Sequence, residues 1–147
     1  MGTNSTIAIE FPDGAIQQVY CHWDGYIDHN GKILFEHYQD PLKLRELINL
    51  GDLSSLAPRI GEKHEFDCPY KYGTPEHKSW REVCTFYGRD RGDDDVSAKK
   101  FKNFADYKAN HRYEQFEYIL RKDGNWYVCQ HGRDYELLDE VLDELEY

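Results

Sequence analysis

The sequence lacks the features that mark membrane-spanning, secreted and disulfide-bonded proteins. No apolar run approaches the roughly 18 residues that a transmembrane helix requires. The first residues, MGTNSTIAIEF, contain neither the basic region nor the apolar region of a secretory signal. The four cysteines are far apart and form no C-x-x-C pair, so we expect free, reduced thiols. These absences predict a cytoplasmic protein without membrane contact.

Basic residues are also scarce relative to acidic ones. Eighteen lysines and arginines stand against 28 aspartates and glutamates, which gives a formal net charge of −10. Binding to a nucleic-acid backbone normally needs an excess of positive charge, so we expect no direct nucleic-acid binding. Mimicry of DNA is a weaker hypothesis, because the excess acids concentrate in residues 134–147 and the rest of the chain is nearly neutral.

Those last residues predict an acidic amphipathic helix over about 135–146. The apolar side chains follow a helical spacing with acids between them: Leu137, Leu138, Val141, Leu142 and Leu145. The apolar side of this helix either covers the sheet or joins a second copy of the chain, so a homo-oligomer stays open. The acidic side is either a solvated helix face or a surface for a basic partner.

The length of 147 residues, with 39% hydrophobic residues, fits one globular domain spanning residues 1–147. Alternating apolar residues with turn sequences predict strands and hairpins, and apolar spacing with capping residues predicts helices. The predicted segments are hairpins of 5–11 with 15–23 and of 115–121 with 126–130, a strand over 81–87, helices over 32–39, 42–50 and 103–110, and loops over 24–31 and 88–95. We therefore expect an α+β fold, with a mainly antiparallel sheet built from hairpins and helices packed on it.

A long segment without predicted regular structure covers residues 57–79. It contains three prolines and two glycines together with three aromatic residues and two histidines. Loops longer than about 15 residues inside a compact domain usually carry function or move. The segment is therefore a candidate binding loop or lid.

One candidate ligand-binding motif is YGRDRG, with Tyr87, Arg89, Asp90 and Arg91. The flanking glycines let the backbone come close to a ligand, and both guanidinium groups could then bind a phosphate or a carboxylate. The alternative is a charged turn in which the neighbouring aspartates neutralise the arginines. The motif matches no known nucleotide-binding signature.

A second candidate motif is YCHWDGY, which supplies Tyr20, His22, Trp23, Asp24 and Tyr26. Aromatic rings can stack on a planar ligand, while a carboxylate and an imidazole supply hydrogen bonds. The same residues equally fit the packed edge of a core. Together the two motifs form our predicted ligand-binding site.

Catalytic and metal-binding signatures are missing. Cys21, His22, His29 and His37 lie near one another in the sequence, but their spacing matches no zinc motif. The two adjacent serines after the second predicted helix lack the G-x-S-x-G pattern of a nucleophile elbow. We therefore predict no catalytic residue, no metal and no cofactor.

Several segments resemble a family of small proteins encoded by tailed bacteriophages. The resemblance covers most of the chain from about residue 5 to 128 and rests on STIAI, VYCHWDGY, HNG, HY, GDLSSL, YGRDRG and WYV. It implies a phage origin and a location in the cytoplasm of the infected bacterial host. It assigns no catalytic residue.

The resemblance implies an accessory protein that counters host defence or aids host takeover, since small acidic phage proteins often bind and disable a host factor. Our first hypothesis is non-catalytic binding to a host protein through residues 57–79, the Arg89 and Arg91 loop or the acidic helix. The alternative is sequestration of a nucleotide-like immune signal by the two motifs. A second alternative is a small metal-dependent hydrolase or nuclease that uses His22, Asp24 and His37. A concave pocket would favour ligand capture, and a flat exposed patch would favour a protein partner.

Overall fold

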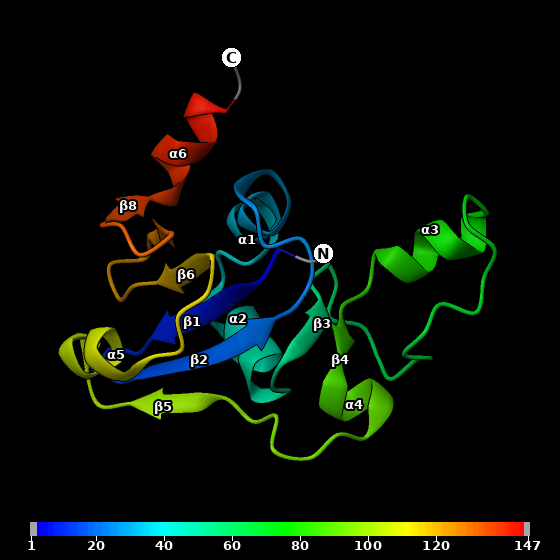
Figure 1. The fold of residues 1–147 in the computed structure, drawn as a ribbon, viewed down its shortest axis with the longest axis horizontal. Helices are drawn as coiled ribbons and strands as arrows, with labels where there is room; N and C mark the ends of the chain where they lie inside the picture. Colours follow the sequence, from blue (N-terminus) through cyan, green and yellow to red (C-terminus); the bar gives the residue numbers. More distant parts are fainter. Residues whose placement is uncertain (1–2, 146–147) are drawn as a thin grey trace.

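The structure, a computed structural model, describes residues 3–145 and contains one mixed sheet (Figure 1). The strand order is β4-β3-β2-β1-β6-β7-β8, and β5 pairs with β2 outside this path. The strands are β1 (Ser5–Glu10), β2 (Ile16–Cys21), β3 (Leu53–Ser55), β4 (Thr85–Phe86), β5 (Lys99–Phe101), β6 (Phe116–Leu120), β7 (Trp126–Gln130) and β8 (Tyr135–Leu137). Among these strands β1 with β6 and β2 with β3 are parallel, and the remaining pairs are antiparallel. The expected α+β fold with a mainly antiparallel sheet is confirmed.

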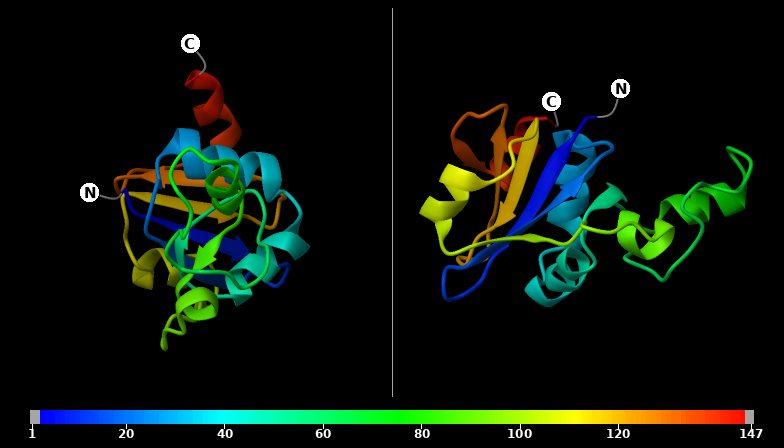
Figure 2. Two further views of the ribbon diagram at one scale, coloured as in Figure 1. Left: turned by 90° about the vertical axis from the view of Figure 1, so that its right-hand side faces the viewer. Right: turned by 60° about the horizontal axis from the view of Figure 1, so that its bottom comes forward.

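The helices lie on both faces of this sheet (Figures 1 and 2). They are η1 (Ile27–Gly31, one turn of π-helix), α1 (Lys32–His37), α2 (Pro41–Asn49), α3 (Pro75–Arg81), α4 (Tyr87–Arg91), α5 (Phe104–Asn110) and α6 (Leu138–Glu144). None of the helices within residues 3–145 has the length and apolar character needed to cross a membrane.

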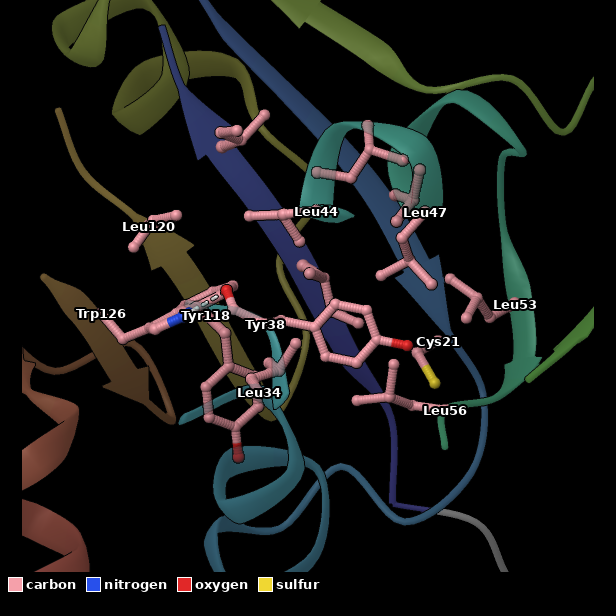
Figure 3. Packing of buried hydrophobic residues seen from close by; sticks show 14 of the residues in the cluster. Cys21, Leu34, Tyr38, Leu44, Leu47, Leu53, Leu56, Tyr118, Leu120 and Trp126 are labelled. Atoms are coloured by element: carbon pink, nitrogen blue, oxygen red, sulfur yellow. Dashed lines mark hydrogen bonds between the residues drawn. The ribbon is translucent and has the colours of Figure 1, made fainter. Parts of the chain in front are cut away.

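The central strand β1 is buried on both faces, because its alternating side chains enter two separate cores. Ile7 and Ile9 belong to the larger core, to which α1, α2 and α6 also contribute. In that core Trp126 donates a hydrogen bond from Nε1 to the carbonyl oxygen of Tyr38 at 3.2 Å (Figure 3). Ala8 points into the smaller core, which α5 covers with the buried Tyr107.

Local sequence signals explain the elements that were expected correctly. The first hairpin turns at Gly14, whose φ of +94° is left-handed. Asp40 caps α2 by accepting a hydrogen bond from the Leu42 amide at 3.0 Å, and Asn103 caps α5 in the same way. The hairpin of β6 and β7 also forms as expected.

Other expectations about secondary structure are corrected. Residues 27–31 and 87–91 form helical turns rather than loops, and residues 75–81 form α3. Only β4 forms within the expected strand over 81–87. The first residue of that range belongs to α3 and the last belongs to α4. The expected terminal helix begins only at Leu138, since residues 135–137 pair with β7 as β8, and its end at 146 lies outside the described residues. Strands β3 and β5 were not expected.

Residues 60–83, which we call the arm, stand away from the sheet and carry α3 (Figures 1 and 2). No residue of α3 is buried. The arm closes at its base, where the Cys84 amide donates to the carbonyl oxygen of Arg59 at 2.8 Å and the Arg59 amide donates to that of Glu82 at 3.2 Å. The arm is thus a projection held at one end, next to the β3 and β4 edge of the sheet.

Candidate functional site

A pocket of about 570 Å³ lies between the arm and the β3 and β4 edge of the sheet. It is lined by residues from the segment that follows β2, from β3, from the arm and from β4 and α4. The lining residues are His22, Trp23, Asp24, Ser54, Ser55, Phe66, Asp67, Cys68, His77, Trp80, Arg81, Thr85, Tyr87 and Arg91. The structure therefore brings residues of both predicted motifs to one concave site.

The YCHWDGY motif reaches the pocket because the chain leaves β2 alongside β3. The amides of His22 and Trp23 donate to the carbonyl oxygens of Leu53 and Ser54, each at 3.0 Å. These bonds extend the parallel pairing beyond β2 and fix the direction of both side chains. Trp23 stays 44% exposed and packs nearly perpendicular to the His22 ring, with ring centroids 4.7 Å apart. An aromatic surface thus remains available at the pocket wall.

The two tyrosines of the YCHWDGY motif lie outside the pocket lining and contact residues that are part of it. The Tyr20 hydroxyl is 2.7 Å from Nδ1 of His22, and burial raises the pKa of Tyr20. The Tyr26 hydroxyl donates to Oδ1 of Asp24 at 3.2 Å. Tyr20 and Tyr26 therefore orient the side chains of His22 and Asp24 from outside the pocket lining.

The YGRDRG motif contributes Tyr87 and Arg91 to the pocket from α4. The Arg91 guanidinium lies over two rings, 4.5 Å from the centroid of Phe66 and 4.9 Å from that of Tyr87. It also donates two hydrogen bonds to Asp93, at 2.9 and 2.7 Å. Because Phe66 belongs to the arm, this stack joins the arm to the body of the protein.

Arg89 and Asp90 have a different place, since neither lines the pocket. The Arg89 guanidinium donates to the carbonyl oxygens of Ile60, Gly61 and Cys84 and to both oxygens of Asp90, at 2.9 to 3.2 Å. We call Arg89 and Asp90 the clamp. The geometry gives no support to the expectation that they meet a ligand, because their hydrogen bonds are made inside the protein.

The clamp also holds the start of the arm through the Asp90 carboxylate. The side chain of Asp90 is fully buried and accepts hydrogen bonds from the amides of His64, at 3.1 Å, and Phe86, at 2.8 Å. His64 lies in the arm and Phe86 in β4, so one carboxylate fixes both. The clamp therefore determines where the arm leaves the sheet.

Sequence reasoning missed several pocket residues, above all Phe66, Trp80, Arg81 and Thr85. The aromatic content of residues 57–79 identified the region, but not which side chains face the pocket. Arg81 forms no ion pair within residues 3–145. Thr85 is 2% exposed, and its Oγ1 has no hydrogen-bond partner among residues 3–145. A buried hydroxyl without a partner is unusual in folded proteins.

The structure offers little support for metal binding or for nucleophilic catalysis by a cysteine. Within residues 3–145 no three His, Cys, Asp or Glu side chains are grouped so as to hold a metal ion. His37 does not line the pocket. Burial raises the pKa of the Cys21 thiol to about 12 and that of Cys129 to about 11, so both thiols stay protonated at neutral pH.

No family model, curated protein or solved structure matches this chain. Its chemistry must therefore be inferred from the pocket itself. The pocket combines aromatic rings, two arginines, two aspartates and four hydroxyl groups. Such a lining can stack on a planar group, bind an anion and exchange several directed hydrogen bonds with one ligand.

Proposed function

We propose that the protein binds a small, planar and anionic ligand of the nucleotide type in this pocket, without a chemical reaction. The observation that carries the proposal is the meeting of aromatic rings and two arginines around one concave site. A concave site of this size favours capture of a small molecule over docking of a flat protein surface.

The aromatic residues would hold the base. Trp23 belongs to the body and Trp80 to the arm, so the pocket offers an indole on each side. Stacking of a base on an aromatic side chain contributes about 1–3 kcal/mol and depends little on which base is bound. The rings therefore supply affinity, and the polar groups would select the base.

The arginines would hold the phosphate. Arg91 is already positioned by its two rings and by Asp93. Arg81 approaches from the arm without an ion pair inside residues 3–145. Guanidinium groups bind phosphate oxygens through charge-assisted hydrogen bonds. Two arginines from opposite sides of the pocket would thus close on one anionic group.

The hydroxyl groups would bind polar atoms of the ligand. Ser54, Ser55 and Thr85 line the pocket from neighbouring strands. A buried hydroxyl that lacks a partner carries a desolvation cost of about 1–3 kcal/mol, which a ligand atom at hydrogen-bonding distance would remove. The buried Oγ1 of Thr85 therefore favours a polar ligand over an apolar one.

In the phage setting that the sequence resemblance implies, this binding would sequester a nucleotide-like signal of host immunity in the infected cell. Inhibition of a host protein is the other proposal. It would use exposed aromatic residues outside the pocket, of which Tyr72 is 80% exposed. We favour the small ligand because the two motifs meet in a hollow and not on a flat surface.

Titration calorimetry of the purified chain against mononucleotides and cyclic dinucleotides tests the proposal. We expect at least one of these ligands to bind, and we expect Arg81→Gln, Arg91→Gln and Trp23→Ala each to weaken it about tenfold or more. Arg133→Gln is the matched control, because Arg133 is exposed and lies outside the pocket. Absence of binding across the panel, or equal losses in Arg133→Gln and Arg81→Gln, would overturn the proposal.

A further inference from the structure

The arm carries a second, separate hollow of about 310 Å³. All of its lining residues belong to the arm: Glu62, His64, Tyr70, Glu76, Ser79, Trp80 and Val83. Residues 77 and 81 of α3 face the first pocket, whereas residues 76, 79 and 83 line this hollow, so the two sites lie on different sides of α3. Trp80 contributes to both.

The charges of the two sites differ. The first pocket contains two arginines and two aspartates, whereas the second hollow has Glu62 and Glu76 and no lysine or arginine among its lining residues. Neither glutamate takes part in an ion pair in the part of the chain that the structure describes. Two carboxylates without a cationic partner in a concave site favour a positively charged ligand.

Two aromatic side chains form walls of the same hollow. Tyr70 is 46% exposed, and Trp80 is fixed by a hydrogen bond from its Nε1 to the carbonyl oxygen of Glu65 at 3.2 Å. The His64 and Trp80 rings pack nearly perpendicular to each other, with ring centroids 5.8 Å apart. Aromatic faces attract cations through the negative charge of their π-systems, most strongly for tryptophan. The combination of aromatic walls and carboxylates is the chemistry that recognises organic cations.

We propose that this hollow binds an alkylammonium cation, such as the quaternary ammonium group of choline or of a trimethylated lysine. The volume lies near the lower end of ligand pockets, which is about 300 Å³, so the hollow admits one head group and not a large ligand. A quaternary ammonium group has no hydrogen-bond donor and is weakly hydrated. It therefore interacts well with aromatic faces and carboxylates without needing a directed hydrogen bond.

Nuclear magnetic resonance of the ¹⁵N-labelled chain at pH 8 tests this site through the indole N–H signal of Trp80, which Trp80→Phe identifies. We expect choline to shift that signal with saturation, and we expect 3,3-dimethyl-1-butanol, which has the same shape without the charge, to bind about tenfold more weakly. A short peptide with one trimethyllysine, compared with the unmodified peptide, shows whether the ammonium group comes from a protein. The proposal is supported if choline binds more tightly than 3,3-dimethyl-1-butanol, or if the trimethyllysine peptide binds more tightly than the unmodified peptide.

Variants separate this site from the nucleotide pocket. Glu62→Gln, Glu76→Gln and Tyr70→Ala should each weaken choline about threefold or more, whereas the exposed Glu140→Gln on α6 should not. Arg81→Gln should leave choline binding unchanged, so the two proposals fail independently. Equal binding of choline and its neutral counterpart, or no effect of the two carboxylate substitutions, would overturn the proposal.

Discussion

Replacement of the buried clamp carboxylate by Asp90→Ala should destabilise the protein strongly. Asp90 accepts hydrogen bonds from the amides of His64 and Phe86 and from two nitrogens of Arg89, and its side chain is inaccessible to solvent. Removing one partner of a buried ion pair costs about 3–5 kcal/mol, because the other charge stays buried without compensation. The free energy of unfolding of a small protein is only about 5–15 kcal/mol, so this loss is a large part of the total.

Urea unfolding followed by circular dichroism measures the effect. With a slope of about 2 kcal/mol per molar urea, the midpoint should fall by roughly 2 M. Asp93→Ala is the matched control, because Asp93 also binds an arginine through two oxygens but in an exposed position. We expect its midpoint to stay close to that of the wild type. Similar midpoints for Asp90→Ala and Asp93→Ala would refute the assignment of Asp90 as a structural anchor.

Further predictions concern pH, thiol reactivity and backbone strain. Burial alone would lower the pKa of His111, but its hydrogen bond to the buried Glu117 and the charge of that carboxylate raise it overall. The resulting stabilisation of the fold is complete below about pH 6.5 and is lost as the pH rises through the raised pKa. The urea midpoint should therefore fall between pH 6 and 9, and it should fall by more in the wild type than in His111→Gln. Three cysteines are buried with raised pKa values and Cys68 is half-buried, so Ellman's reagent at pH 8 should modify one thiol quickly and none in Cys68→Ser. Gly51→Ala should cost at least about 1–3 kcal/mol by thermal unfolding, because φ is +87° and an added Cβ would lie 2.4 Å from a backbone oxygen. Gly14→Ala should lower the free energy of unfolding clearly less than Gly51→Ala. Its φ is +94°, but an added Cβ would have no described atom within 4 Å beyond the glycine and its two chain neighbours.

The parts of the fold that could be predicted from the sequence are those determined by local signals. The hairpins of β1 with β2 and of β6 with β7 follow from alternating residues around short turns. The helix α3 also has a local signal, since Thr74 caps it and Pro75 occupies its first position, but the surrounding prolines and glycines obscured that signal. Its prediction as irregular structure was therefore an avoidable error.

The remaining elements depend on contacts between distant residues. Strand β8 forms because residues 135–137 pair with β7, although their sequence continues smoothly into the helical pattern of α6. Strands β3 and β5 contain only three residues each and are defined by their pairing with β2. A local pattern of three residues is too short to predict a strand, so tertiary pairing decides these cases.

In the candidate site, too, the types of side chain can be read from the sequence, whereas their positions depend on contacts between distant residues. YCHWDGY and YGRDRG both supply side chains to the pocket, and the pairing of β3 with β2 and with β4 brings the two motifs to one edge. No local signal distinguishes Arg89 from Arg91, which lie two residues apart in the chain. On the short helix α4 this difference turns Arg89 toward carbonyl oxygens at the base of the arm and Arg91 toward Phe66 and the pocket.

The arm connects the clamp to both proposed sites. Arg89 and Asp90 fix its base, Arg91 and Phe66 stack across its contact with the body, and Trp80 forms a wall of each hollow. A ligand in either site therefore contacts a segment that few buried side chains hold in place. If ligand binding orders the arm, part of the conformational entropy is lost at the first binding event, and the second ligand binds a segment that is already ordered. The two sites should for this reason show positive coupling, in which choline tightens nucleotide binding and the nucleotide tightens choline binding by the same factor.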